Sequence, residues 1–303
     1  MKNRTPRIIP LILFALFFAL IPISASADTG PKASVNITFE NTERMGGDSF
    51  YVTLLANEEG RGPWYMAEGD SPSYNYGIDE DIFDKFKTFA EDDEFYLWPY
   101  IEECHGTFVF GYYPPTTFKI LVYSPKDDKF AISNIYERYA FHSYYTVSLE
   151  GFSEISVSTH GEITEEKLLT ATESYDHTNE IRGLIARLII TLGIELILAY
   201  IFGYKRALST SVILIANAIT QILLNLYLNY DIYLHGNSFI YRLGGYLFIE
   251  LLILIAEGTL YAFTVAKLSE DPSKKKAFIY AAVANILSFI IGIYLAVKIP
   301  TLF

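Results

Sequence analysis

The stretch IRGLIARLIITLGIELILAYIF, residues 181–202, decides the architecture of the C-terminal part of this chain. Three further apolar stretches follow it, at residues 207–228, 239–265 and 277–297. A helix of about 20 apolar residues spans the roughly 30 Å hydrocarbon core of a bilayer. The sequence therefore predicts a membrane domain, residues 179–303, built as a four-helix transmembrane bundle.

The connectors between these stretches predict how the bundle is threaded. Lys205 and Arg206 lie between the first and second spans, and Lys267 and residues 274–276, all lysine, lie between the third and fourth. The connector at 229–238 contains no Lys or Arg. Basic loops stay in the cytoplasm. We therefore expect the segment before the first span, and the C-terminus, to lie outside the cell membrane.

The N-terminus independently predicts export. Lys2, Arg4 and Arg7 precede an apolar run at residues 11–21, and the small residues 24–27 end on Ala27. A basic head, a short apolar core and an A-x-A ending are typical of a secretory signal peptide, here residues 1–27. The alternative is an uncleaved anchor, which would export the following segment equally well.

Charge separates the exported segment from the membrane domain. Residues 28–178 carry 28 acidic and 10 basic side chains, and the net charge of the whole chain is −12. Nucleic-acid binding needs a clustered basic surface, so no nucleic-acid partner is expected. The single cysteine, Cys104, excludes an intrachain disulfide and a multi-cysteine zinc site.

The exported segment reads as short strands separated by turns. Alternating apolar residues predict a strand at 34–39, and a turn at 45–48 leads to a second at 50–55, as in a hairpin. An amphipathic helix is expected over 78–90 after a long loop at 57–77. Further strands are predicted at 108–112, 118–122, 130–132, 139–149 and 152–158. We expect a β-rich extracellular domain, sandwich-like or barrel-like, antiparallel, with one short helix.

Motifs for chemistry are lacking in this segment. The acidic residues Asp79, Asp81 and Asp84 do not follow the EF-hand pattern and are better explained as a solvated face. The sequence contains neither a nucleophile elbow nor a His-Glu-x-x-His motif. Its many aromatic residues favour a sheet core over a ligand groove. We predict no metal, no cofactor and no catalytic residue.

Polar side chains inside the predicted spans form a candidate intramembrane polar site. Its members are Glu195, Asn217, Gln221, Glu250, Glu257 and Asn285. Helical spacing puts Asn217, Thr220, Gln221 and Asn225 on one stripe of the second span. Since an ionised carboxylate in hydrocarbon costs at least ~2.5 kcal/mol, these acids should face the bundle interior or stay protonated. They either bind a cation or relay protons, or they hold the helices together by neutral hydrogen bonds.

Several short sequence segments resemble those of a known protein family, and they are spread over most of the chain after residue 27. They are Tyr113-Pro114-Pro115, Phe118 to Tyr123, Arg138 to Phe141, Asn217 to Gln221 and Glu250 to Glu257. With them the chain resembles a family of uncharacterised bacterial, mainly Gram-positive, envelope membrane proteins with a signal peptide, an extracellular domain and four transmembrane helices. The resemblance implies an envelope location and this architecture, and it implies no activity.

Two functions from different classes follow from these patterns. The first is a non-enzymatic integral membrane protein of the cell envelope, whose extracellular domain binds or senses a ligand or an envelope protein partner. The alternative is a small transporter or ion-coupled carrier that uses Glu195, Glu250 and Glu257. An intramembrane enzyme is disfavoured because the spans contain no Cys or His nucleophile or metal-ligand set.

Overall fold

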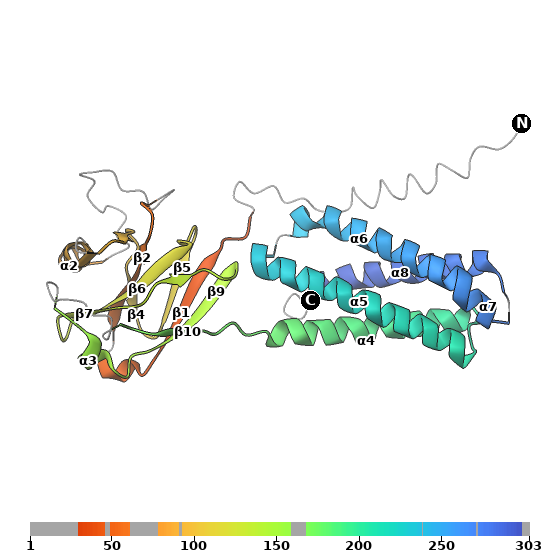
Figure 1. Ribbon diagram of the computed structural model, residues 1–303, viewed down its shortest axis with the longest axis horizontal. Coiled ribbons are helices and arrows are strands. Elements are labelled where there is room, and N and C mark those ends of the chain that lie inside the picture. The colour runs from red at the N-terminus through yellow and green to blue at the C-terminus, as the bar shows by residue number, and fades with distance from the viewer. Residues whose placement is uncertain are drawn as a thin grey trace, which may run out of the picture. The chain divides into compact units, whose positions relative to one another are not determined.

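A computed structural model describes residues 30–45, 49–60, 78–90, 93–158, 168–237, 239–270 and 272–298, without the side chains of 239–242 and 295–298. The predicted signal peptide and most of the predicted turn at 45–48 and loop at 57–77 lie outside these residues. The described chain has a β-rich N-terminal region followed by four long apolar helices (Figure 1). This coarse architecture is the predicted one.

The first sheet has four strands in the order β10-β9-β1-β5. They are β1 (Ser34–Glu40), β5 (Thr107–Gly111), β9 (His142–Ser148) and β10 (Ala171–Glu173). β1 pairs antiparallel with β5 but parallel with β9, which corrects the expected all-antiparallel arrangement. Parallel neighbours need a long crossover, and here the whole second sheet supplies it.

The second sheet is built around β2 (Phe50–Ala56) and β6 (Thr117–Ser124), which pair antiparallel. Its other strands are β3 (Tyr96–Leu97), β4 (Glu102–Cys104), β7 (Lys129–Ile132) and β8 (Tyr136–Glu137). Because β1 and β2 lie in different sheets, the expected hairpin between them is wrong. The short 3₁₀ helix η2 (Thr42–Met45) follows β1 and buries Met45, and the chain then enters the other sheet.

Both sheets contribute to one apolar core. Alternate residues of β1 and β5, among them Val35 and Phe108, pack with Phe118, Ile120 and Val122 of β6. The other face of β6 packs under α2 (Glu80–Ala90), where Leu121 and Tyr123 meet three phenylalanines of the helix, Phe83, Phe86 and Phe89. The strand predicted at 118–122 and the predicted amphipathic helix are therefore confirmed.

Two local expectations in this region are wrong. Residues 152–158 were expected as a strand, but α3 (Phe152–Ile155) forms a helical turn that follows Gly151 and buries Phe152. The strand predicted at 108–112 includes Tyr112, whose ring a two-residue alternation would place on the same face as Phe108 and Phe110. Its ring is instead exposed, because β5 ends at Gly111 and the backbone turns left-handed at Tyr112, with φ near 58°.

The C-terminal part consists of four helices long and apolar enough to cross a membrane. They are α4 (Thr178–Ile201), α5 (Ala207–His235), α6 (Phe239–Leu260), which continues through the π-helical turn η4 (Tyr261–Val265) into α7 (Ala266–Leu268), and α8 (Lys274–Lys298). Helices are found over all four predicted apolar stretches. The connector expected at 229–238 is mostly helical, since α5 runs on to His235 and ends at Gly236, whose φ of 78° suits glycine.

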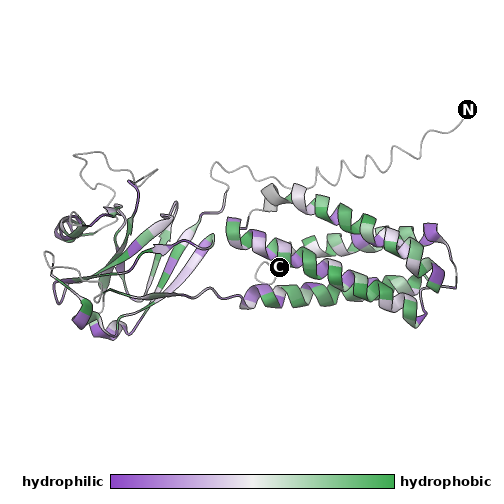
Figure 2. Cartoon of the chain, in the orientation of Figure 1, coloured by the Kyte–Doolittle hydropathy of each residue, from purple (hydrophilic) through white to green (hydrophobic). Residues whose placement is uncertain are grey.

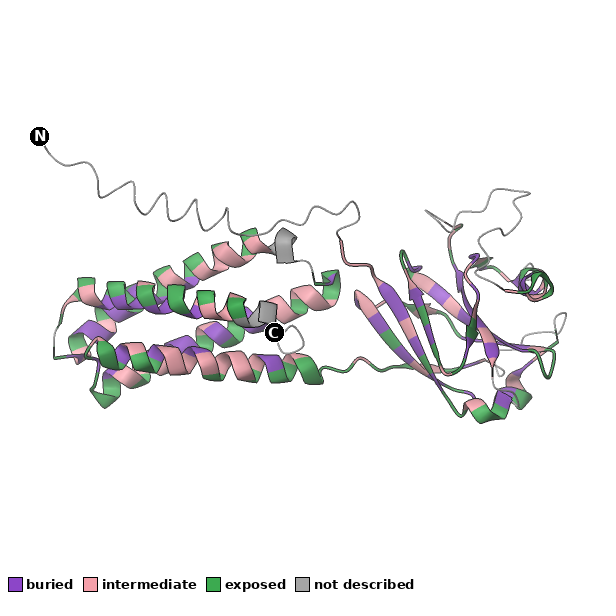
Figure 3. Cartoon of the chain, turned by 180° about the vertical axis from the view of Figure 1, so that it is seen from behind, coloured by how far each residue is buried: buried purple, intermediate pink, exposed green. Residues whose placement is uncertain are grey.

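Apolar residues make up most of each of the four long helices (Figure 2), and many of them are exposed. Ile189 of α4, Ile197 of α4 and Leu223 of α5 each leave more than 60% of their surface exposed. Figure 3 shows fully buried positions as a minority along these helices. A soluble protein would leave this surface in water at a high cost, whereas lipid chains cover it. The exposed surface therefore suits contact with a lipid bilayer.

Candidate intramembrane polar site

The helical bundle buries polar side chains from all four of its long helices. Glu195 of α4, Asn217 of α5 and Glu257 of α6 are at most 2% exposed, and Asn285 of α8 is nearly as buried. Each sits in a helix whose outer surface is apolar, so helical periodicity turns these residues inward. The sequence predicted this inward orientation from the cost of exposing a polar group to hydrocarbon.

Glu257 joins three helices. Its Oε1 lies 2.6 Å from the Thr220 hydroxyl of α5, and its Oε2 accepts a hydrogen bond of 2.8 Å from the Asn285 amide of α8. The Thr220 hydroxyl is also 3.1 Å from the carbonyl oxygens of Ala216 and Asn217. The Thr220 hydroxyl can donate to Glu257, or it can donate to a carbonyl of its own helix and accept a hydrogen bond from a neutral Glu257 carboxyl, so this network does not require a charge on Glu257.

Glu195 ties α4 to α8 through a tyrosine. The Tyr280 hydroxyl lies within hydrogen-bond distance of Glu195 Oε2 and 3.1 Å from the backbone carbonyl of the same residue. The hydroxyl can therefore donate to the carbonyl and accept from a protonated carboxyl, as at Thr220. Next to it, the Asn217 amide donates to the Tyr261 hydroxyl at 2.8 Å, which links α5 to the π-helical turn.

Aromatic rings close this network on the side of the 203–206 and 266–276 connectors. Tyr280 packs against Tyr204, Phe202 and Tyr261, with ring centroids 5.3, 5.4 and 5.8 Å away. Tyr204, Tyr261 and Tyr280 are at most 2% exposed. The acids therefore lie behind a layer of packed rings at this end of the bundle.

On the other side, the polar stripe of α5 continues along the helix. Gln221 and Asn225 are buried, and the Asn225 amide donates to the Gln221 carbonyl at 2.7 Å. Arg187 of α4 donates to the Asn225 side-chain oxygen at 2.9 Å. The predicted stripe Asn217, Thr220, Gln221 and Asn225 thus faces the neighbouring helices along its whole length.

Glu250 is set apart from the other acids. It is only half-buried, and its side chain interacts with that of Tyr246, one turn earlier on the same helix. Glu257 contacts side chains of α5 and α8, whereas this contact of Glu250 stays within α6. The structure therefore brings Glu195, Asn217, Glu257 and Asn285 together and leaves Glu250 nearer the edge of the bundle.

The sequence interpretation missed the tyrosines of the network. Tyr261 and Tyr280 were counted as apolar residues of their spans, yet their hydroxyls contact Asn217 and Glu195. One signal was available for Tyr261, because it follows Glu257 by four residues and so lies on the same helical face. No spacing in the sequence could connect Tyr280 with Glu195, since 85 residues separate them.

Within its described residues, the β-rich region offers ion pairs but no comparable site. Lys85 donates to Asp128 and Tyr123, which lowers the pKa of the Asp128 carboxyl below its ordinary value. Asp79, Asp81 and Asp84 are exposed. Among the described residues, no group of three or more His, Cys, Asp or Glu side chains could hold a metal ion. The acidic residues of α2 therefore form a solvated face.

No family model, curated protein or solved structure matches this chain.

Proposed function

We propose that the protein is a non-enzymatic integral membrane protein of the cell envelope. Its β-rich region binds a ligand or an envelope protein partner outside the membrane, and its four helices hold that region at the bilayer. The observation that carries this proposal is the pairing of Glu195 and Glu257 with hydroxyl and amide groups of neighbouring helices. Such neutral hydrogen bonds fix a bundle without requiring a transported ion.

The orientation of the protein is part of this proposal. The signal-peptide pattern at residues 1–27 and the basic connectors at 203–206 and 266–276 both favour an extracytoplasmic β-rich region. The resemblance to envelope membrane proteins supports the same location. The excess of acidic side chains over residues 28–178 favours a ligand or partner of net positive charge.

Single cysteines in a Cys104→Ser background test the orientation. Thr107→Cys in β5 and Leu234→Cys near the end of α5 replace exposed residues, and Pro272→Cys replaces an exposed residue of the 266–276 connector. We expect a membrane-impermeant maleimide to label the first two in intact cells and the third only after lysis. Labelling of Pro272→Cys in intact cells, with Thr107→Cys protected, would reverse the proposed orientation.

A proteoliposome assay tests the anchor function. The purified full chain is reconstituted, and proton, sodium and potassium fluxes are followed under an imposed gradient. An anchor gives no flux above that of empty vesicles. The matched variant Glu195→Gln/Glu257→Gln keeps similar hydrogen-bonding groups without an ionisable carboxyl, and it should fold and remain in the membrane like the unchanged protein.

The alternative function is a small ion-coupled carrier, and one observation favours it. Buried polar groups run along α5 from Asn217 through Gln221 to Asn225, next to Glu195 and Glu257. Intramembrane acids in such a setting often serve proton or cation pathways. A gradient-driven flux that the double glutamine variant abolishes would establish the carrier and refute the anchor.

A further inference from the structure

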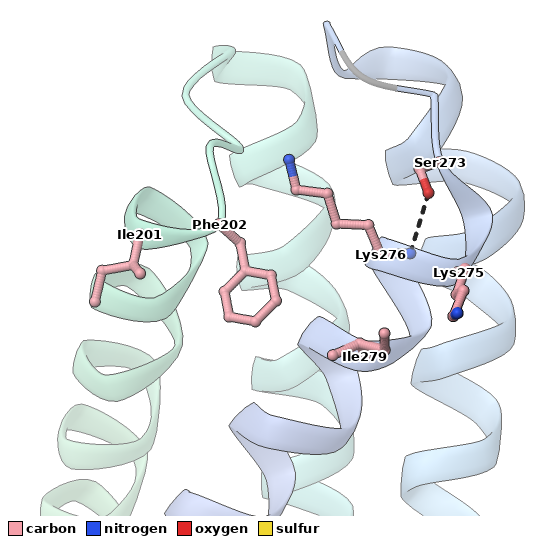
Figure 4. Close-up of a pocket in the computed structure, with 6 residues that line it drawn as sticks. All are labelled: Ile201, Phe202, Ser273, Lys275, Lys276 and Ile279. Carbon is pink, nitrogen blue, oxygen red and sulfur yellow. Dashed lines mark hydrogen bonds between the residues drawn. The ribbon is translucent and has the colours of Figure 1, made fainter.

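A groove opens at the end of the bundle that carries the two basic connectors. It lies between the end of α4 and the beginning of α8, with a volume of about 430 Å³ (Figure 4). Its lining residues are Ile201, Phe202, Ser273, Lys275, Lys276 and Ile279. None of them belongs to the intramembrane polar site, so the groove is a separate feature of the fold.

The groove combines an apolar wall with a cationic rim. Ile201 and Ile279 are 68% and 45% exposed, and they belong to the apolar outer surface of α4 and α8. Lys275 and Lys276 stand in the first turn of α8, where the Lys276 amide donates to the Ser273 hydroxyl at 3.3 Å. Figure 4 shows the Lys276 side chain reaching over Phe202 toward the end of α4, with Lys275 on the opposite edge.

The cations at this end of the bundle contact aromatic rings and an acidic side chain. Lys205 lies over the Tyr200 ring at 4.5 Å, Lys274 lies over the Phe263 ring at 4.4 Å, and Arg206 approaches Glu270 at 3.7 Å. Lys276 in turn lies over the Tyr204 ring at 5.9 Å. Lys275 and Lys276 both line the groove, and the positive end of the α8 dipole adds to their potential. The local charge is complementary to an anion.

We propose that this groove binds an anionic phospholipid of the bilayer. Lys275 and Lys276 bind the phosphate of its headgroup, and the first carbons of an acyl chain lie against Ile201 and Ile279. An inorganic phosphate would leave the exposed isoleucines uncovered, whereas a lipid contacts both the cationic rim and the apolar wall of the groove. Basic pockets between transmembrane helices are suited to such headgroups because they pair charge in a layer of reduced dielectric.

The test counts lipids retained by the full chain in native mass spectrometry. Protein from nanodiscs of phosphatidylglycerol is compared with protein from nanodiscs of phosphatidylcholine. The variant Lys275→Met/Lys276→Met removes both charges but keeps the aliphatic stems that pack at the groove. Each lysine near an anionic lipid raises the binding constant about fivefold, so removing two lysines should weaken the retention of phosphatidylglycerol roughly thirtyfold.

The matched control is Lys205→Met/Lys274→Met, which removes the same charge at the same end of the bundle. We expect it to retain phosphatidylglycerol within about twofold of the unchanged protein. A thermal melt of each variant checks folding, and Ile279→Ser, which keeps all lysines, should also weaken retention. Equal losses in both methionine variants, equal retention of phosphatidylcholine, or displacement of the lipid by millimolar inorganic phosphate would each overturn the proposal.

Discussion

Replacing Glu257 with leucine should destabilise the four-helix bundle by a small, calculable amount. The change removes two interhelical hydrogen bonds, to Thr220 at 2.6 Å and to Asn285 at 2.8 Å. Interhelical hydrogen bonds in membrane proteins average about 0.6 kcal/mol and reach about 1.7 kcal/mol. Both partners keep a second bond within their own helices, because Thr220 is 3.1 Å from the Ala216 carbonyl and Asn285 is 3.0 Å from the Ala281 carbonyl.

No buried group is therefore orphaned, and we expect a loss near the lower value, about 1–1.5 kcal/mol in the free energy of unfolding. Glu257→Gln should lose less than about 0.5 kcal/mol, because its amide can donate to Thr220 while its carbonyl accepts from Asn285. A double-mutant cycle with Asn285→Leu should give a coupling of roughly 0.6 kcal/mol. Thr259→Leu, a polar-to-apolar change at an exposed position of the same helix, serves as the control.

Unfolding in bicelles, followed by steric trapping, measures these differences on the full chain. A glutamine variant that loses as much stability as the leucine variant would contradict the neutral network, because an ionised carboxylate accepting from both partners cannot be replaced by an amide. A leucine variant as stable as the unchanged protein would refute the claim that Glu257 holds the helices together.

Three further predictions concern the β-rich region. Residues 28–175 should fold as a soluble fragment with a cooperative urea transition, because both core clusters of this region draw on residues within this range; a random-coil circular dichroism spectrum would contradict this. Phe108→Ala should cost about 3–5 kcal/mol in urea unfolding, since its ring is fully buried, while its exposed neighbour changed as Val109→Ala should cost under about 0.5 kcal/mol. Burial lowers the pKa of His142, so the stability that it confers is present above its unfolded pKa of about 6.5 and is lost as the pH falls toward the folded value. The melting temperature of His142→Gln should therefore depend less on pH below about 6.5 than that of the unchanged protein. The control His105→Gln, at an exposed position, should keep the original pH dependence.

The sequence predicted those helices that a periodic or continuous run of apolar residues is enough to specify. The four spans were readable because a bilayer-spanning helix needs a long apolar run, and α2 because its phenylalanines recur at helical spacing. The inward orientation of Asn217, Gln221 and Glu257 followed from the cost of placing polar groups in lipid. In each case the burial found in the structure agrees with the periodicity of the sequence.

The strand order could not be obtained in the same way. The alternating apolar residues of β1 identify it as a strand but do not indicate which strand it pairs with. Its parallel neighbour β9 lies more than a hundred residues away in the chain. The left-handed backbone at Tyr112 and Tyr113 also has no signal in residue type, because glycine or asparagine would normally occupy such positions. These features depend on how the two sheets close around a shared core.

By itself the sequence determined which residues are apolar enough to lie in lipid, several longer strands such as those at 34–39, 50–55 and 118–122, and which polar groups must avoid the hydrocarbon. Only the tertiary structure decided which of these polar groups meet. It set Tyr280 against Glu195 across two helices, gave Glu257 its partners Thr220 and Asn285, and left Glu250 with Tyr246 of its own helix. The physical reason is that a hydrogen bond depends on atoms being about 3 Å apart, and the packing of helices far apart in the chain sets that distance.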